Sequence, residues 1–224
     1  MIEGFKVKYC FETILTSERP LTGAFPMVCF CDIPLSNVKD HLRSYGHYGI
    51  GLSKKWASAN GINPVLYLDK TSGLSGKLFK QGLRSQNDQG IVQQEWLDNF
   101  MQICSYIKNY DGELLRKTKR FLNYRFYNER EWRYIPNTEL LTDFPNAVAK
   151  AEYLKDKVML NEKAAKIKLV FNFNDISYII VKNEKEISSI AKHIKESYKN
   201  KCSEKDLEIL LSKILTTYQI KNDF

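Results

Sequence analysis

Short apolar runs bounded by proline, glycine or asparagine recur in the first third of the chain. Residues 25–34 (FPMVCFCDIP), 48–52 (YGIGL) and 63–69 (NPVLYLD) have this pattern, which predicts buried strands. Residues 36–46 and 53–61 lie between them, and each begins with a serine and ends with a glycine. Serine is a good helix N-cap and glycine a good helix stop, so two short helices are expected there, capped by Ser36 and Ser53.

The middle of the chain contains a polar, glycine-rich segment followed by segments with helical and strand patterns. Residues 71–90 are rich in glycine and polar residues and are interpreted as a loop or lid. Residues 91–110 place apolar side chains at roughly helical spacing, which predicts a long amphipathic helix. Residues 121–136 (FLNYRFYNEREWRYIP) are expected to form a strand, and residues 144–165 a helix or an irregular excursion.

The end of the chain returns to strands and then to helices. Residues 166–174 and 176–183 predict two strands joined by a tight turn at Asn174 and Asp175. Residues 184–200 and 203–220 predict two amphipathic helices, the second with Ser203 and Asp206 in capping-box-like spacing. The fold class is therefore α+β, with a mostly antiparallel sheet and flanking helices. We expect one domain over residues 1–224, with a core over 1–182 and a helical pair over 183–224.

Composition supports a folded core and adds a cellular setting. The chain is 43% hydrophobic and 12% aromatic, enough for a sizeable interior. No apolar run approaches the length of a membrane span, and the first ten residues lack the apolar segment of a signal peptide. The five cysteines are an odd, scattered set rather than a disulfide framework, so a reduced, cytoplasmic setting is expected.

The formal charge of +8, from 34 Lys+Arg against 26 Asp+Glu, suggests a polyanionic partner. The alternative explanation, a lysine-rich solvated surface, needs no such partner and is favoured. The densest basic cluster precedes an aromatic pair, Tyr124 and Phe126, and such a mixture could bind a single-stranded nucleic acid. The end of a helix with cations in its last turn would look similar. The candidate nucleic-acid-binding residues are Arg116, Lys117, Lys119, Arg120 and Arg125.

Most standard chemical motifs are missing from the sequence. Cys29 and Cys31, with His41 and His47, contain four metal-ligand types, but the cysteines are one residue apart on an expected strand. Zinc sites usually separate such pairs by two to four residues, so buried small hydrophobic side chains are favoured over zinc, and no metal is predicted. No phosphate-binding loop or nucleophile elbow occurs.

The segment YNEREWRYIP (127–136) carries the strongest candidate chemistry. On a strand, Glu129, Glu131 and Arg133 point to one face, and Trp132 and Tyr134 to the opposite, core side. These carboxylates could pair with Arg125 and Arg133 along an exposed strand and have no function beyond that. Alternatively, arginine keeps one glutamate ionised while the other orients a ribose hydroxyl or activates a nucleophile.

Three stretches resemble the AbiGi family of abortive-infection proteins. They are PMVCFCDIPLS (26–36), YGHYGIGLSKKWA with GINPVLYL (within 45–68), and YNEREWRYIP (127–136). The resemblance covers roughly the first 140 residues. It implies a role in bacterial phage defence, as an antitoxin with a toxin partner.

A second resemblance bears on mechanism. Glu-x-Glu on a strand that ends in proline is similar to the element of ADP-ribosyltransferases that acts on NAD. It implies that Glu131 binds the nicotinamide ribose and that Glu129 helps to activate the acceptor. Tyr48 or Trp56 would stack on nicotinamide, and Ser53 and Arg133 would complete the NAD site.

The chain departs from both patterns at its start. AbiGi relatives have an opening strand and a short helix before the segment that matches IEGFKVKYC, so Met1 is expected to lie inside that helix. The residue by which transferases anchor the dinucleotide would lie on that opening strand. Two hypotheses follow: an effector that transfers ADP-ribose from NAD to a nucleic acid or protein, or a non-catalytic antitoxin that binds a toxin or DNA.

Overall fold

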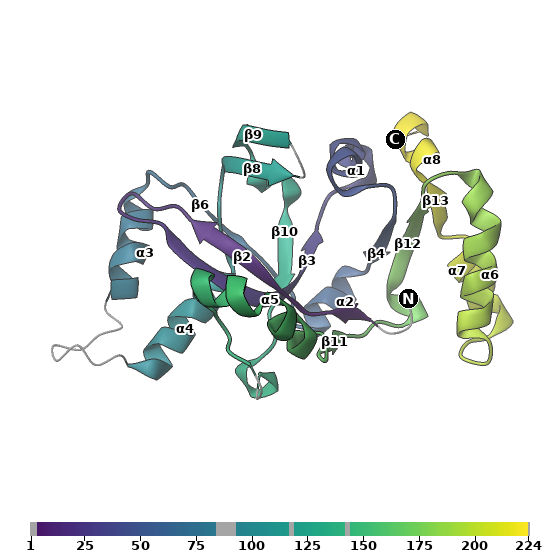
Figure 1. The fold of residues 1–224 in the computed structure, drawn as a ribbon. Coiled ribbons are helices and arrows are strands. Elements are labelled where there is room, and N and C mark those ends of the chain that lie inside the picture. Colours follow the sequence, from purple (N-terminus) through teal and green to yellow (C-terminus); the bar gives the residue numbers. More distant parts are fainter. Residues whose placement is uncertain (1–3, 84–92, 117–118, 142–143, 224) are drawn as a thin grey trace. The chain divides into compact units, whose positions relative to one another are not determined.

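The computed structural model describes residues 4–83, 93–116, 119–141 and 144–223. The chain folds into two compact units, each assembled from separate segments (Figure 1). Unit 1 contains Met1–Gly4, Ile33–Gly61 and Val170–Phe224, and unit 2 contains Phe5–Asp32 and Ile62–Leu169. Each unit has its own sheet and its own helices.

Unit 2 is organised by a four-stranded antiparallel sheet in the order β2-β3-β10-β5. Its strands are β2 (Lys8–Ile14), β3 (Leu21–Cys31), β10 (Glu131–Tyr134) and β5 (Asn63–Pro64). Strand β3 pairs with β2 along its first part and with β10 along its last part, where Cys29 lies opposite Arg133. Strand β3 therefore lies between β2 and β10 and connects them through its two parts.

Unit 2 also contains three smaller strand pairs among its described residues. They are the antiparallel β1 (Phe5–Lys6) with β11 (Lys168–Leu169), the parallel β6 (Leu66–Leu68) with β7 (Ile107–Asn109), and the antiparallel β8 (Gly112–Arg116) with β9 (Lys119–Tyr124).

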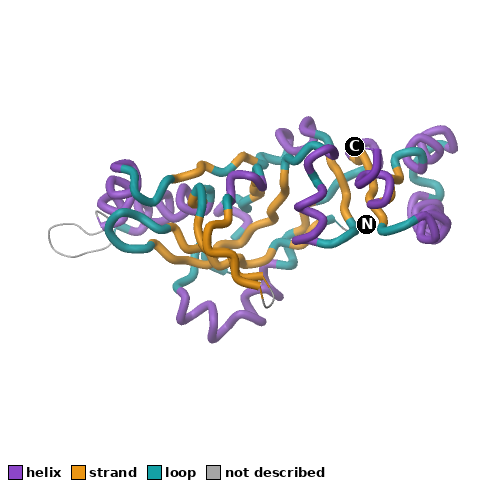
Figure 2. The backbone as a smooth tube through the Cα atoms, turned by 90° about the horizontal axis from the view of Figure 1, so that it is seen from above, coloured by secondary structure: helices purple, strands orange, loops and turns teal. Residues whose placement is uncertain are grey.

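Helices α3 (Gly73–Leu83), α4 (Gln94–Ser105) and α5 (Lys150–Ala164) pack around these strands. Helix α5 contacts β2 and β3, and Figure 2 shows it on one side of the strands. Its Tyr153, Leu160 and Ala164 are buried in a cluster with Val7 and Ala24. A second cluster gathers Phe100 of α4 with Phe25 and Met27 of β3. Apolar packing therefore covers the sheet from more than one side.

Unit 1 has a three-stranded sheet in the order β13-β12-β4, formed by β13 (Ile214–Thr216), β12 (Ile176–Val181) and β4 (Gly49–Leu52). Strand β12 pairs antiparallel with β4 and parallel with β13. The helices of this unit are α1 (Lys39–Tyr45), α2 (Lys54–Ala59), α6 (Ile187–Tyr198), α7 (Glu204–Leu211) and α8 (Thr217–Asp223). Val38, Leu42, Ile180 and Ile220 form its core.

The structure confirms the α+β class and several local predictions. Strands cover most of 25–34 and 48–52, and Gly46, with a φ of 102°, ends α1. The Ser53 hydroxyl accepts a hydrogen bond from the Trp56 N–H at 3.2 Å, and Ser203 and Asp206 form the predicted capping box of α7. Ser36 does not cap α1, because a 3₁₀ turn over Leu35–Asn37 precedes that helix.

Three other predictions are wrong in part. Residues 73–83 form helix α3 rather than a loop, and their glycines do not prevent it because Ser75 and Gly76 are buried against neighbouring structure. Residues 63–69 form two short strands, β5 and β6, which pair with different partners. Ile107 belongs to β7 and not to the preceding helix.

Tertiary pairing also changes the expected end of the chain. Strands β11 and β12 do not form a pair, because β11 joins β1 while β12 lies between β4 and β13. The expected helix over 203–220 is interrupted by β13, whose Ile214 pairs with Ile179. The order of local elements follows sequence pattern here, but the pairing partners depend on distant segments.

None of the helices in the described residues is both long and apolar enough to cross a bilayer.

Two glycines on β4 offer a matched test of packing in unit 1. A Cβ added to Gly51 would lie 2.3 Å from a ring atom of Tyr178, whereas at Gly49 the nearest atom, from Ile180, is 3.6 Å away. We expect Gly51→Ala to lower the free energy of unfolding by about 1–3 kcal/mol, and Gly49→Ala to change it by less than about 1 kcal/mol. Urea denaturation followed by circular dichroism measures both. Equal effects would contradict this account of β4.

Candidate functional site

The two candidate glutamates occupy different local structures. Glu129 ends a 3₁₀ turn over Phe126–Glu129, and Arg130 follows with a left-handed φ of 44°. Strand β10 begins only at Glu131. The prediction of one continuous strand through 127–136 is therefore wrong, because the chain turns at Arg130. Both carboxylates nevertheless end up near one cation, Lys108.

A network of charged side chains, here called the charge cluster, surrounds β10. It consists of Glu12, Lys108, Glu129, Glu131 and Arg133. The Arg133 Nε lies 2.7 Å from Glu131 Oε1, and one of its terminal nitrogens lies 2.7 Å from Glu12 Oε1. The Lys108 Nζ lies 2.6 Å from Glu131 Oε2 and 3.6 Å from Glu129 Oε2.

The cluster lies inside unit 2. The Arg133 side chain has no exposed surface, and the side chains of Glu129 and Glu131 are each 5% exposed. Along β10, Glu131 and Arg133 are buried while Trp132 and Tyr134 are half-buried. The alternative in which the charged residues lie along an exposed strand is therefore wrong. Tyr134 packs against the apolar cluster around Val7 and Ala24, as expected for the core side. Both faces of β10 are covered, and the charged face is the more deeply buried.

Neutral groups also form hydrogen bonds with the cluster. Arg133 donates a third hydrogen bond to the Ser105 carbonyl oxygen at 2.5 Å, and the Tyr124 hydroxyl donates to Glu129 Oε1 at 3.1 Å. The backbone N–H of Glu131 donates to the Tyr67 hydroxyl at 2.8 Å. Burying these charges is tolerable because each is paired and hydrogen-bonded.

The electrostatic balance keeps Glu131 ionised. Burial acts to raise the pKa of Glu131, but the Arg133 guanidinium and the Lys108 ammonium lower it to about 2. Burial raises the pKa of Glu12, although Arg133 and Lys108 oppose that shift. Burial acts against the charge on Lys108, yet Glu131 and Glu12 raise its pKa overall. An effective general base has a pKa near the working pH, whereas the pKa of Glu131 is far below neutral pH.

Strand β3 also corrects the expectation for Cys29 and Cys31. Both cysteines are exposed rather than buried, because the pairing of β2 with β3 ends at Met27 and leaves the rest of β3 without that neighbour. Among the residues that the structure describes, no three His, Cys, Asp or Glu side chains gather in a way that could hold a metal ion.

The expected NAD contacts Tyr48, Ser53 and Trp56 belong to unit 1, whereas Glu129, Glu131 and Arg133 belong to unit 2. Trp56 is buried, and its indole N–H donates to the Val170 carbonyl oxygen at 3.0 Å. Ser53 caps α2, as described above. Tyr48 is 68% exposed and its hydroxyl donates to Glu186 at 3.0 Å. Ser53 and Trp56 therefore have clear local structural roles.

The basic residues proposed for nucleic acid lie on and beside the β8–β9 hairpin. Arg116 and Lys119 are opposite each other in its register, and Lys117 lies outside the described residues. Arg120 forms an exposed ion pair with Glu113 at 2.7 Å. The Arg125 guanidinium lies over the Tyr110 ring, 5.5 Å from its centroid, and the cation found beside Glu129 is Lys108.

Sequence reasoning missed Lys108 and Glu12, which complete the charge cluster. Lys108 falls within the segment read as helix, and Glu12 stands 119 residues before Glu131 in sequence. Alternation in KYCFETI (8–14) places Glu12 on one face of a strand, and this was the available local signal. No local pattern, however, shows which distant strand Glu12 will face.

Comparison with known proteins agrees with the resemblance. The family model described as "Putative abortive phage resistance protein AbiGi, antitoxin" matches residues 4–182. An abortive phage resistance protein AbiGi from Lactococcus lactis subsp. cremoris is 33% identical over 224 aligned residues, which cover 89% of this chain and 88% of that protein. No solved structure matches the chain.

The charge cluster makes a direct prediction about stability. Glu131→Gln removes one charge from a buried network and leaves Arg133 and Lys108 under-compensated, so we expect the free energy of unfolding to fall by about 3–5 kcal/mol. Glu113→Gln breaks the exposed pair with Arg120 and should have a much smaller effect, because surface ion pairs contribute little to stability. Chemical denaturation compares the two variants. A Glu131→Gln protein as stable as Glu113→Gln would show that the cluster does not hold the fold.

Proposed function

Because this chain belongs to the AbiGi family of abortive phage resistance proteins, we propose that it is a non-catalytic antitoxin that binds and neutralises a partner toxin. One observation carries the non-catalytic part of this proposal. Both oxygens of Glu131 are held in internal ion pairs, and its side chain is 5% exposed. A substrate hydroxyl would have to displace Lys108 or Arg133 from a buried site, which is costly.

An antitoxin also needs a surface for its partner, and helix α5 offers one. Tyr153, Leu160 and Ala164 bury one face of this helix against unit 2. Leu154 and Val158 are nevertheless 63% and 71% exposed. An amphipathic helix normally directs polar residues to solvent, whereas α5 has apolar residues on both faces. Outward apolar side chains of this kind favour a protein contact.

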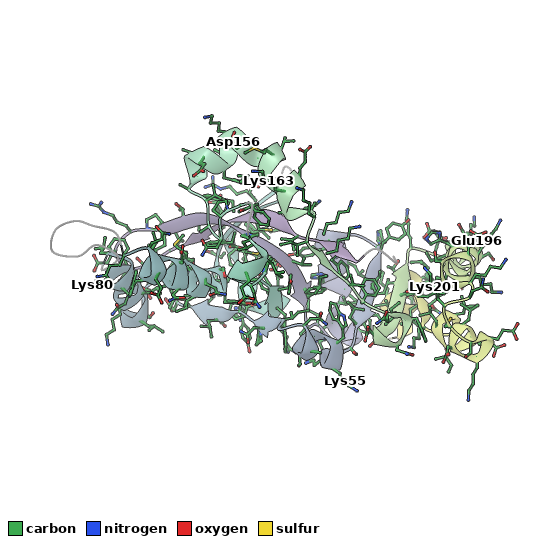
Figure 3. All side chains as sticks on the ribbon, turned by 90° about the horizontal axis from the view of Figure 1, so that it is seen from below. Lys55, Lys80, Asp156, Lys163, Glu196 and Lys201 are labelled. Carbon is green, nitrogen blue, oxygen red and sulfur yellow. The ribbon has the colours of Figure 1, made fainter. Side chains whose placement is uncertain are left out.

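The charge around α5 suggests the chemistry of the partner. Residues 150–168 contain six lysines and three acidic residues, a net charge of +3. Lys155 and Lys157 are exposed on either side of Asp156, and Figure 3 shows the helix with Asp156 and Lys163 labelled. A partner with an apolar groove rimmed by carboxylates would complement this face.

Co-purification tests the proposal. The tagged chain is co-expressed with the protein encoded by the neighbouring gene, which is the natural candidate for a toxin. We expect the two proteins to co-purify and the chain to rescue growth. Val158→Asp should reduce recovery of the partner at least tenfold, because it places a carboxylate in the apolar contact.

Leu74→Asp is the matched control. Leu74 is 66% exposed on α3, so the same change is made on another helix of unit 2. It should leave both recovery and rescue unchanged, and the melting temperatures of the two variants should agree. Full recovery of the partner by Val158→Asp would exclude α5 as the contact, and absence of any complex or rescue would contradict the antitoxin proposal.

The alternative function, NAD-dependent ADP-ribosyl transfer, stays a prediction with a clear test. It requires that NAD at millimolar concentration raises the melting temperature of the chain, since a ligand that binds only the folded state stabilises it. The antitoxin proposal expects no shift. A rise of several degrees that Tyr48→Ala abolishes would favour the transferase. ADP-ribose serves as the matched control ligand that lacks nicotinamide.

A further inference from the structure

A row of aromatic side chains lies beside the charge cluster, next to the basic residue Arg125. Tyr67 comes from β6, Tyr110 follows β7, and Tyr127 comes from the 3₁₀ turn before β10. The Tyr67 and Tyr127 ring centroids are 5.2 Å apart in an edge-to-face arrangement, and the Tyr110 and Tyr127 centroids are 5.5 Å apart and stacked. The Arg125 guanidinium covers Tyr110. We call these four residues the tyrosine row.

The backbone holds this row in place. The Tyr127 N–H donates to the Tyr110 carbonyl oxygen at 3.2 Å, and the Tyr110 N–H donates to the Leu68 carbonyl oxygen at 2.9 Å. Tyr67 accepts the Glu131 N–H, so the row is tied to the start of β10. The rings are therefore ordered before any ligand arrives, and binding a planar group there would cost little conformational entropy.

The row ends at solvent. Tyr127 is 48% exposed although it contacts two other rings, and Arg125 and Arg130 on either side of it are exposed. An exposed tyrosine held between ordered aromatics presents a flat surface on which a further ring can stack. An arginine that lies over an aromatic ring can likewise stack on a base while its charge remains available to phosphate.

The surrounding charge matches a polyanion. Residues 110–130 contain six Lys+Arg and three Asp+Glu, a net charge of +3. Within this segment Asp111 pairs with Lys70, Glu113 with Arg120 and Glu129 with Lys108, so its acidic side chains have cationic partners. The described cations next to the exposed rings are Arg125 and Arg130, and both are exposed.

From this geometry we propose that the tyrosine row is a binding site for single-stranded nucleic acid. Bases stack on Tyr127 and Arg125, and the basic side chains beside them contact the phosphates. Stacking accepts any base, so the site is expected to have little sequence preference. Bases in a duplex are already stacked on each other and do not expose their faces, so duplex DNA is a poor ligand for such a site. This activity goes beyond the proposed binding of a toxin and uses other residues.

Fluorescence anisotropy with a labelled 12-nucleotide oligouridine, and with oligothymidine as the DNA arm, tests the proposal. We expect Tyr127→Leu to weaken binding about 5- to 150-fold, which is the effect of losing the stacking of one base on an aromatic ring. Tyr127→Phe keeps the ring face and should retain binding. Arg125→Ala should weaken binding and lower the slope of log affinity against log salt by about 0.7, as expected for one lost phosphate contact on a single strand.

Matched controls separate this site from general electrostatics. Tyr218→Leu removes a tyrosine that is 66% exposed on α8, and Lys55→Ala removes a cation from α2 (Figure 3). Both variants should bind within twofold of the unaltered chain, and circular dichroism should show that all variants are folded. Tighter binding of a 12-base-pair duplex than of either single strand would overturn the proposal. The proposal is also overturned if Lys55→Ala weakens oligonucleotide binding as much as Arg125→Ala does. It is overturned as well if Tyr127→Leu leaves binding unchanged.

Discussion

Arg133 imposes the constraint on which unit 2 depends. Its guanidinium cannot lose its proton inside a protein, so a fully buried Arg133 needs acceptors on all sides. Glu131 on the same strand, Glu12 on β2 and the Ser105 carbonyl at the end of α4 supply them. Glu12 and Ser105 lie 121 and 28 residues before Arg133, so the one cation fixes β2 and the end of α4 relative to β10. Loss of any acceptor would leave part of a buried charge unsatisfied.

The same constraint limits what the glutamate pair can do. Two carboxylates close together would repel each other, and Lys108 between them removes that repulsion by binding both. The compensation that makes the pair stable also occupies its oxygens. Paired acids on a strand therefore do not by themselves indicate catalysis, since their counter-ions decide whether they are available to a substrate. The proposed contacts therefore use exposed side chains on α5 and in the tyrosine row instead.

Sequence pattern predicted what depends on neighbours along the chain. The caps at Ser53 and Ser203 and the alternation of Glu131 with Arg133 follow local rules, and they could be read directly. The turn at Arg130 could not, because a non-glycine residue with positive φ is uncommon and the ends of the segment hold it there. Lys108 and Glu12 could not be assigned either, since their roles depend on pairings across more than twenty and more than a hundred residues. The tyrosine row likewise depends on side chains that only the fold brings together, whereas Leu154 and Val158 are four residues apart on α5.

The buried charges also explain why β10 pairs with β3 in one register. Arg133 lies opposite Cys29, and a shift by one residue would turn Glu131 and Arg133 to the other face of the sheet. There they would meet the apolar cluster against which Tyr134 packs, with neither Glu12 nor Lys108 within reach. Hydrophobic pattern alone would distinguish the two registers weakly, because both faces of β10 are covered. The cost of an unpaired buried arginine distinguishes them strongly. The charge cluster thus specifies the arrangement of strands that holds Tyr67 and Tyr127 together. The tyrosine row depends on that arrangement.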